Sequence, residues 1–406
     1  MNPPPFPLPF LLDGAYFSNL VAMGMPTNGC VEQWLCDNPA ALQKLQQDFL
    51  QAGAQALCTP TPEASAFHLS LYGLEDKVEE INTRLFNITK QNAQAAGVPV
   101  IGTLGPSGRF IPPFGESDFD SLYDQYREQI RVLEENGADG FLLQDQTSLA
   151  DMRAAVLAAR TTDLPIFVTL AVDASGHTVT GCSLLPCLIT LQAMGVEAVG
   201  LSGTLSPEEM LPFFEDILPH TQIPLLAQPN IRHPRGQDYL PPRQFAQEMK
   251  ALLQTGVSIL GGSEGVSPAH VAQLKQQIAG IPLPPFLPEE ADCYAASTET
   301  QVFFLRDTLE FSEPLECSIN LGEDLIDLDD EQSNVALVEI HSVDDALLLA
   351  EQGHMSRLPL AVQAESLPVL DAALRYFQGR LIVSSDCLIE REHIEARAAK
   401  YGAIVY

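Results

Sequence analysis

Acidic and amide side chains stand at the carboxyl ends of predicted strands in this 406-residue chain. Asp13, Asp145, Asn230 and Glu264 each follow a short apolar run. In a parallel strand–helix repeat these ends gather at one face, so we expect the four side chains to share a pocket. A carboxylate at the mouth of such a pocket either binds a cation or faces water, and the sequence leaves both interpretations open.

Thiol and imidazole groups are scattered along the chain. The sequence has 8 cysteines and no CxxC pair, which argues against a disulfide framework and against a zinc ribbon. The side chains considered for a metal site at the pocket mouth are Cys58, Asp145, His177, Cys182, Cys187 and Glu264. No HExxH or paired-cysteine spacing supports such a site. Cys58 and Cys187 are therefore predicted to be packing residues, and no metal ion is predicted.

Strands and helices must alternate to bring these residues together. The predicted strands are Pro9–Leu12, Ala56–Thr59, Val98–Leu104, Gly140–Leu143, Ile166–Val172, Ala198–Leu201, Pro224–Ala227 and Ser258–Leu260. Helical patterns lie between them, and Ser267 followed by Pro268 predicts the start of the last helix. This repeat favours an α/β fold, a closed (β/α)8 TIM barrel. The alternative, a doubly wound open sheet, would leave two strand edges and lacks a glycine fingerprint for nucleotides.

The chain is predicted to have three parts. They are a barrel over 1–280, a Pro-rich linker and acidic segment over 281–331, and a small α/β domain over 332–406. The prolines at 282, 284, 285 and 288 are typical of a semi-rigid linker. In the last part, strands are predicted at Val335–Ile340, Leu358–Val362, Leu381–Ser384 and Ala403–Tyr406. This part is too short for a second full barrel.

Composition restricts the partners and the compartment. The formal net charge of −32 argues against nucleic acid and against an anionic membrane as partners. Hydrophobic residues make up 46% of the chain, which is enough to build packed cores. The start Met1–Pro5 lacks the basic segment of a signal peptide, and no apolar run is long enough to span a bilayer. We therefore expect a cytoplasmic protein.

Several short motifs occur in the order found in one enzyme family. They are Asp13-Gly14-Ala15, Cys30-Val31-Glu32, Thr59-Pro60-Thr61-Pro62, Tyr72-Gly73-Leu74-Glu75-Asp76, Gly102-Thr103-Leu104-Gly105-Pro106, Gln228-Pro229-Asn230 and Gly261-Gly262. On these motifs, the chain resembles the homocysteine S-methyltransferase family, the barrel that opens cobalamin-dependent methionine synthase. The resemblance runs from Leu11 to about Val271. It implies a TIM barrel whose chemistry lies at the strand ends.

The resemblance also implies a zinc ion held by three cysteines. Zinc lowers the pKa of a homocysteine thiol, so that the thiolate can accept a methyl group. Gly203, Ser263 and Glu264 stand at the three ligand positions in this chain. Glycine offers no side chain, and a serine hydroxyl is a poor zinc ligand at neutral pH. We therefore expect the family zinc to be absent and predict no cofactor.

Substrate contacts are also implied by the resemblance. Asp13, Gly14, Glu32 and Asn230 lie in the shared motifs and are candidates for binding an amino acid or thiol ligand. Each has a structural alternative. Asp13 would cap a turn, Gly14 would serve backbone geometry, Glu32 would be a solvated loop acid and Asn230 would bond loop backbone.

Gln144 and Asp145 complete the candidate set. Gln144 stands where the resemblance implies a glutamate that recognises the substrate amino group. A neutral amide pairs less strongly with an ammonium group than a carboxylate does. Asp145 is the nearest carboxylate, but adjacent strand residues point to opposite faces, so the two are expected to diverge. The sequence therefore assigns no catalytic residue.

Two functions are consistent with these features. The first is a family barrel with altered or lost catalysis in corrinoid and one-carbon metabolism, for which zinc-dependent methyl transfer to homocysteine is doubtful. The second is a non-catalytic structural or regulatory partner of a corrinoid methyltransferase system, with the acidic stretch Glu323–Glu331 as its first candidate contact surface. Residues 358–385 resemble, over a short stretch, the pterin-binding barrel of methionine synthase, which suggests a shortened remnant.

Overall fold

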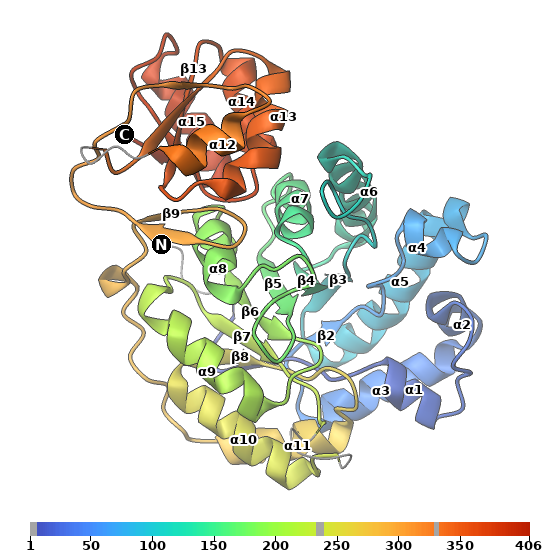
Figure 1. Cartoon of the computed structure of the whole chain (residues 1–406). Helices are drawn as coiled ribbons and strands as arrows, with labels where there is room; N and C mark the ends of the chain where they lie inside the picture. The colour runs from blue at the N-terminus through green and yellow to red at the C-terminus, as the bar shows by residue number, and fades with distance from the viewer. Residues whose placement is uncertain (1–5, 233–238, 329–332) are drawn as a thin grey trace.

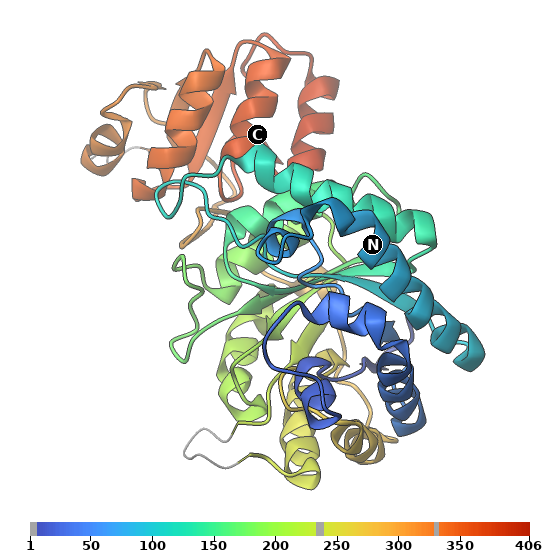
Figure 2. The same cartoon turned by 90° about the vertical axis from the view of Figure 1, so that its right-hand side faces the viewer.

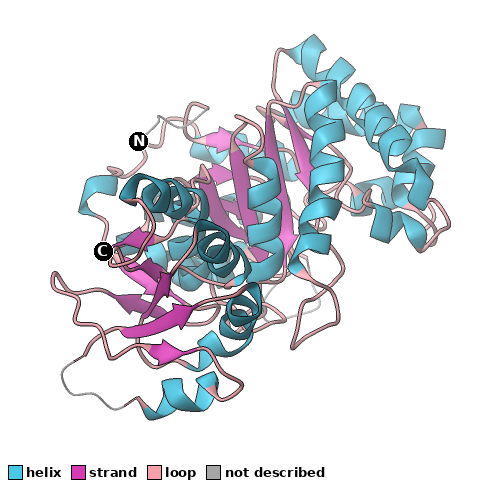
Figure 3. Cartoon of the chain, turned by 90° about the horizontal axis from the view of Figure 1, so that it is seen from above, coloured by secondary structure: helices cyan, strands magenta, loops and turns pink. Residues whose placement is uncertain are grey.

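The computed structural model describes residues 6–232, 239–328 and 333–406. Within these ranges the chain forms a curled eight-stranded parallel sheet, a two-stranded hairpin and a five-stranded parallel sheet. Figure 1 shows the large sheet enclosed by its helices, with the second domain in orange and red against one side. Figure 3 shows the strands of both sheets in magenta with helices packed around them. The predicted barrel followed by a smaller α/β domain is confirmed.

Every run that was predicted to be a barrel strand overlaps an observed strand, with ends that differ by at most three residues. The strands are β1 (Phe10–Leu11), β2 (Leu57–Cys58), β3 (Val100–Leu104), β4 (Gly140–Gln146), β5 (Ile166–Ala171), β6 (Ala198–Ser202), β7 (Leu225–Gln228) and β8 (Val257–Leu260). Their order in the sheet is β1-β8-β7-β6-β5-β4-β3-β2. The two end strands are joined by Gln55, whose N–H donates to Leu11 O (2.7 Å) and whose side chain accepts from Leu11 N (2.8 Å).

Helices follow the strands and cover the outside of the sheet. They are α1 (Phe17–Ala22), α2 (Val31–Asp37), α3 (Pro39–Ala52), α4 (Ala66–Ser70), α5 (Val78–Ala96), α6 (Phe119–Asn136), α7 (Leu149–Ala159), α8 (Leu184–Ala193), α9 (Pro207–Ile217), α10 (Pro242–Thr255) and α11 (Pro268–Ile278). Short 3₁₀ turns lie at Glu75–Lys77, Leu218–His220, Pro288–Glu290 and Gly353–Met355. Helix α11 begins after Ser267 with Pro268 at its first position, as predicted.

The barrel has two apolar layers. Its interior is filled by inward-facing strand residues such as Phe10, Leu142 and Phe167. A larger cluster lies between the strands and the helices, with Phe49, Phe86 and others fully buried. Strand residues point alternately to the two layers. Because both faces of each strand are apolar, the strands appear in the sequence as continuous hydrophobic runs.

The second domain is built from the same type of unit. Its strands are β11 (Leu315–Glu316), β12 (Ala336–Ile340), β13 (Leu360–Ala364), β14 (Ile382–Val383) and β15 (Ile404–Val405), all parallel and in sequential order. Its helices are α12 (Leu321–Asp327), α13 (Val343–Gln352), α14 (Leu367–Tyr376) and α15 (Arg391–Tyr401). Sequential order is also the order of strands in a (β/α)8 barrel. Descent from a shortened pterin-binding barrel stays a prediction.

The segment between the two sheets has secondary structure that the sequence analysis did not assign. It contains the antiparallel hairpin β9 (Ala295–Ser297) and β10 (Val302–Phe304). Leu305, Leu309 and Phe311 then cover one face of the second sheet. The acidic stretch Glu323–Glu331 lies partly on α12, and its part from 329 onward, like Met1–Pro5, is outside the described residues.

Two barrel helices are more deeply buried than the others because the second domain and the hairpin cover their outer sides. All residues of α7 are buried, and α8 packs against β9. A helix exposed on one side would show a polar face. Figure 2 shows the helices of the second domain lying against those of the barrel. None of the helices in the described ranges is both long and apolar enough to cross a lipid bilayer.

Buried polar contacts fix this interface. The guanidinium of Arg153 on α7 donates to Leu374 O (2.7 Å) and to Arg375 O (3.1 Å) at the end of α14. Asp120 on α6 accepts from Arg375 Nε (2.6 Å) and from the hydroxyl of Tyr376 (2.9 Å). The last carbonyls of a helix lack intrahelical donors, so Arg153 supplies donors that α14 needs.

Candidate ligand pocket at the carboxyl ends of the strands

A cavity of about 350 Å³ opens at the carboxyl ends of the barrel strands. This volume is at the lower end of the range for small-molecule sites. The structure brings to it seven of the residues selected from the sequence, namely Asp13, Gly14, Glu32, Gln144, Asp145, Ser263 and Glu264. Gly203 and Asn230 are not among its lining residues. The expectation of a shared pocket therefore holds for Asp13, Asp145 and Glu264 and is wrong for Asn230.

Asp13 lies on the wall of the cavity between β1 and β2. Its Oδ2 accepts from the Tyr16 hydroxyl (2.8 Å) and from Cys58 N (3.0 Å). Burial raises the pKa of the Asp13 carboxyl to about 6, although these hydrogen bonds lower it. The contacts join two strands, so Asp13 does more than cap the turn that follows β1.

Glu32 is buried, which corrects the alternative of a solvated loop acid. It lies in the first turn of α2 with an exposed fraction of 4%. Burial is the main reason that its pKa rises to about 7, and the charge of Glu63 adds to the rise. The thiol of Cys30 lies 3.5 Å from Glu32 Oε2 and is its nearest side-chain donor. Glu32 can therefore exchange a proton near neutral pH.

Gln144 and Asp145 both line the cavity, so the expectation that they diverge is wrong. The reason is a bulge in β4. Leu143 pairs with Val168 and Gln146 with Leu170, so three steps along β4 match two along β5. A bulge interrupts the alternation of side chains and redirects one of them.

Asp145 takes a backbone conformation that is rare for a residue with a side chain. Its φ is +55°, and no other non-glycine residue in the described ranges has a positive φ. Thr169 Oγ1 accepts from its N–H (3.2 Å), and Ser202 Oγ lies 2.5 Å from its Oδ1. Burial raises the pKa of the carboxyl, and the Ser202 hydrogen bond lowers it. A positive φ strains the backbone of a residue with a side chain. Strain of this kind persists where the surrounding structure imposes it, often at functional sites.

The three positions of the implied zinc ligands do not provide a metal site. Gly203 has no side chain and a φ of +89°; a Cβ there would lie 3.4 Å from Asp145 Oδ1. Ser263 is buried and Glu264 is exposed at the cavity mouth. Among the residues that the structure describes, no three His, Cys, Asp or Glu side chains are placed to hold a metal ion. The donor set present does not fit the family's zinc.

The other side chains considered for metal binding lie apart. His177 is exposed and lies 3.1 Å from Ser175 Oγ. Cys182 and Cys187 are fully buried, and Cys182 Sγ donates to Glu299 Oε1 (3.2 Å). Cys58 alone of these lines the cavity.

Asn230 takes the structural role given as its alternative. Its side-chain amide donates to Thr204 O, and its oxygen accepts from Arg232 N (2.8 Å). These bonds tie the loop after β7 to the loop after β6. Asn230 therefore shapes the rim of the barrel without lining the cavity.

Gly14 is required by close packing. A Cβ at this position would lie 2.7 Å from Val266 O and 2.8 Å from Cε1 of Phe49. We expect Gly14→Ala to lower the free energy of unfolding by about 1–3 kcal/mol, because the backbone at Val266 or the ring of Phe49 must shift to make room for the methyl group. Urea denaturation measures this loss. A variant as stable as the wild type would show that the loop after β1 relaxes freely.

Several residues of the cavity were not selected as site candidates from the sequence, although Gln228 and Tyr72 stand in the motifs shared with the family. Gln228 ends β7, lines the cavity and is 3% exposed, and its Oε1 has no hydrogen-bond partner among the described residues. Tyr16, Glu63 and Tyr72 also line it. Gln228 follows the strand-end rule that selected Asp13 and would have been found by it. The other three lie on loops whose course only the fold reveals.

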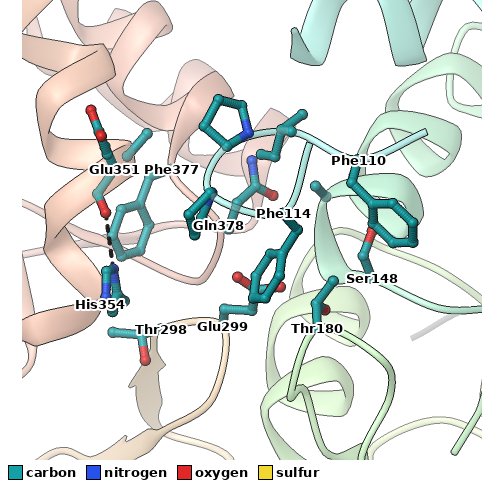
Figure 4. A pocket seen from close by; sticks show the side chains of 15 residues that line it. Phe110, Phe114, Ser148, Thr180, Thr298, Glu299, Glu351, His354, Phe377 and Gln378 are labelled. Carbon is teal, nitrogen blue, oxygen red and sulfur yellow. Dashed lines mark hydrogen bonds between the residues drawn. The ribbon is translucent and has the colours of Figure 1, made fainter. Parts of the chain in front are cut away.

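Two further cavities lie away from the carboxyl ends of the barrel strands. One, between the domains, holds about 40 Å³, room for only a few water molecules, and its lining includes Phe110, Phe114, Glu299 and His354 (Figure 4). In this lining His354 Nδ1 lies 2.9 Å from Glu351 O. The other, of about 370 Å³, lies near the amino ends of β7 and β8 under the Pro-rich segment. Barrel enzymes place their sites at the opposite face.

Comparison with known proteins agrees with the fold and the position of the cavity. The homocysteine S-methyltransferase family model matches residues 10–278, which is more than half of the chain. The chain therefore belongs to the homocysteine S-methyltransferase family.

Relatives with longer chains extend the match. The methionine synthases of Mycobacterium tuberculosis and Mycobacterium leprae are 25% and 24% identical to this chain, and the alignments cover 97% and 93% of its residues. The chain spans only 37% and 35% of the length of those two proteins. The alignments therefore continue beyond the barrel into the second domain.

Solved structures share the barrel fold. The homocysteine methyltransferase MmuM from Escherichia coli, in its metallated form, superposes with a TM-score of 0.57 and 21% identity. The match covers 66% of this chain and 96% of that chain. Its apo form gives a TM-score of 0.55. At this identity the likeness concerns the fold.

Proposed function

We propose that this chain is a member of the homocysteine S-methyltransferase family that keeps a small-molecule pocket but has lost zinc-dependent methyl transfer to homocysteine. The proposal concerns the step that such a reaction needs first. A thiol must lose its proton to become a nucleophile, and a free thiol is mostly protonated at neutral pH.

Two thiols carry the proposal: Cys58 in the cavity lining and Cys30, which lies outside the lining but next to the lining residue Glu32. Cys58 lines the cavity, and burial, followed by the charge of Asp13, raises its pKa well above the ordinary value. Cys30 lies beside Glu32, and burial raises its pKa to about 11. A substrate thiol placed among the same carboxylates would be kept protonated for the same reasons. The pocket therefore opposes the ionisation that methyl transfer requires.

The donor set supports the same conclusion. Zinc thiolate chemistry needs soft or nitrogen ligands in a tetrahedral arrangement. Gly203, Ser263 and Glu264 offer at most a hydroxyl and one carboxylate. The remaining polar groups of the cavity suit ligand binding through hydrogen bonds and charge.

Zinc content and turnover test this proposal together. The full chain is purified with excess zinc, dialysed, and analysed for metal, and methionine formation from homocysteine and methylcobalamin is then measured. We expect far less than one zinc per chain and no methionine above the protein-free rate. The homocysteine methyltransferase MmuM from Escherichia coli, treated in parallel, is the control for zinc retention. One retained zinc per chain together with turnover would overturn the proposal.

A further inference from the structure

A second large cavity lies at the amino ends of the barrel strands, on the face opposite the candidate ligand pocket. It has a volume of about 370 Å³ and lies between β7, β8 and the Pro-rich segment that follows α11. An apolar cavity of about 150 Å³ is enough to hold benzene, so this one has room for a molecule of about two rings. Its volume is within the range of small-molecule sites.

The lining of this cavity is mostly apolar. Of its 18 residues, 12 are Leu, Ile, Ala, Phe or Pro, among them Leu218, Leu225 and Leu283. Phe286 and Leu287, which belong to the Pro-rich segment, are 48% and 56% exposed, so their side chains are not packed into a core. Apolar surface of this kind favours a ligand that removes it from water.

The Pro-rich segment forms a roof that is fixed at both ends. Ile281 N donates to Ile278 O (3.1 Å) at the end of α11. Asp292 N donates to Pro219 O (2.9 Å), and His220 Nδ1 lies 2.7 Å from Asp292 O. Proline fixes its own φ, so the prolines between these two anchors restrict the conformation of the roof. The chain itself therefore holds the cavity in place.

Ser258 supplies a polar group inside this apolar lining. Val257 and Ile259 pair with consecutive residues of β7, so Ser258 between them is the extra residue of a bulge in β8. Ser258 is 6% exposed and lines the cavity. Among the described residues its hydroxyl has no hydrogen-bond partner, and its oxygen keeps surface that a small molecule can reach. Buried polar groups are almost always paired, so this hydroxyl indicates a partner that the protein does not provide.

The charges at the cavity favour a neutral ligand. No Lys, Arg or His is among the lining residues that the structure describes, so an anion would find no positive side chain there. The two carboxylates of the lining belong to Glu290 and Asp292, which are exposed. An exposed carboxylate attracts a cation only weakly, because water and salt screen its charge. The Ser258 hydroxyl can donate to and accept from a neutral hydroxyl group, and can donate to a carbonyl.

We propose that this cavity binds a small neutral molecule with an apolar body of about two rings and one hydroxyl or carbonyl group. The apolar body lies against the Pro-rich roof, and the polar group forms a hydrogen bond with Ser258. The site is separate from the candidate ligand pocket, so this inference goes beyond the proposed function and does not depend on whether methyl transfer is lost.

Equilibrium dialysis of the full chain at pH 7 tests this inference. The probes are 2-naphthol, naphthalene and 2-naphthoate, which share the two-ring body and differ in the polar group. We expect saturable binding of 2-naphthol, and binding of 2-naphthoate that is about tenfold or more weaker, because its carboxylate meets no positive charge in the lining. Equal binding of these two probes, or no saturable binding of 2-naphthol, would contradict the proposal.

Variants of the roof locate the bound probe. Phe286→Ala and Leu287→Ala should each weaken the binding of 2-naphthol about fivefold, because apolar contact is lost. Leu388→Ala is the matched control, since Leu388 is 88% exposed and lies outside the lining. If the roof variants bind 2-naphthol as tightly as the control does, the probe binds elsewhere on the chain and the proposal is wrong.

Ser258→Ala tests the hydrogen bond and keeps the apolar lining. It should weaken the binding of 2-naphthol about threefold to tenfold, the effect of one net hydrogen bond, and leave the binding of naphthalene unchanged. Circular dichroism establishes whether each variant folds, and the comparison of 2-naphthol with 2-naphthoate needs only the wild type. An equal effect of Ser258→Ala on 2-naphthol and naphthalene would overturn the assignment of this hydroxyl as the polar contact.

Discussion

Replacing Arg153 with alanine should lower the free energy of unfolding by about 2–4 kcal/mol, because buried carbonyls lose their donors and a void is left. Arg153 is 1% exposed and donates to Leu374 O and Arg375 O across the domain interface. The truncation removes these donors from the end of α14 and leaves a void beside the ring of Phe119, which lies 5.8 Å from the guanidinium carbon. Both losses occur in an interior that water cannot enter freely.

We also expect the unfolding of the second domain to separate from that of the barrel. Arg153 is central to the contact between α7 and α14, so its loss should turn one transition into two. Urea denaturation followed by circular dichroism measures both effects. Arg391→Ala is the matched control, because Arg391 is exposed and pairs with Glu395 on its own helix. A variant of Arg153 that unfolds like this control would show that the interface does not depend on the guanidinium.

The stability of the ligand-free protein should fall as pH rises from about 4 to about 8, by about 3 kcal/mol for each of two buried carboxyls. The pKa of Asp13 rises from 3.8 to about 6, and that of Glu32 from 4.5 to about 7. In this range the folded protein holds protons that the unfolded chain has released. The stabilisation is therefore complete below the unfolded values and is lost as pH passes the folded ones.

The neighbours of the two carboxyls explain why they do not ionise readily. Glu32 lies near Glu63 and the Cys30 thiol, neither of which offers a positive charge. Asp13 is bonded by Tyr16 and by the backbone of Cys58. Burial therefore decides the direction of both shifts.

Variants isolate this contribution from the rest of the acidic chain. Glu32→Gln should be more stable than the wild type at pH 8 and should show a shallower dependence on pH. Glu116→Gln, an exposed substitution of the same type, should keep the wild-type slope. The measurement is urea denaturation at several values of pH. An unchanged slope in Glu32→Gln would mean that Glu32 is ionised in the folded protein as readily as in the unfolded one.

Much of the fold followed from local sequence patterns. The eight barrel strands and the start of α11 at Ser267 and Pro268 were predicted because apolar runs and caps are properties of neighbouring residues. The strand-end rule also placed Asp13, Asp145 and Glu264 at one cavity, and it was wrong for Asn230, which lies outside the lining. These features need only the position of a residue relative to its own strand.

Other features depend on residues distant in the sequence. The face to which Asp145 points is set by a bulge, by Thr169 and by Ser202, which belong to β5 and β6. All residues of α7 are buried, and only the fold shows that α14 lies against this helix through Arg153. The pKa values of Asp13 and Glu32 likewise depend on burial by other elements.

The sequence by itself thus determined the strand–helix repeat and the acidic residues at the strand ends, and it has Gly203, Ser263 and Glu264 where the resemblance implies zinc ligands. Only the tertiary structure decided which acids are buried together and which of them face the same cavity. The physical reason is that residue type and spacing act locally, whereas desolvation and side-chain direction at a bulge arise from contacts between strands far apart in the chain.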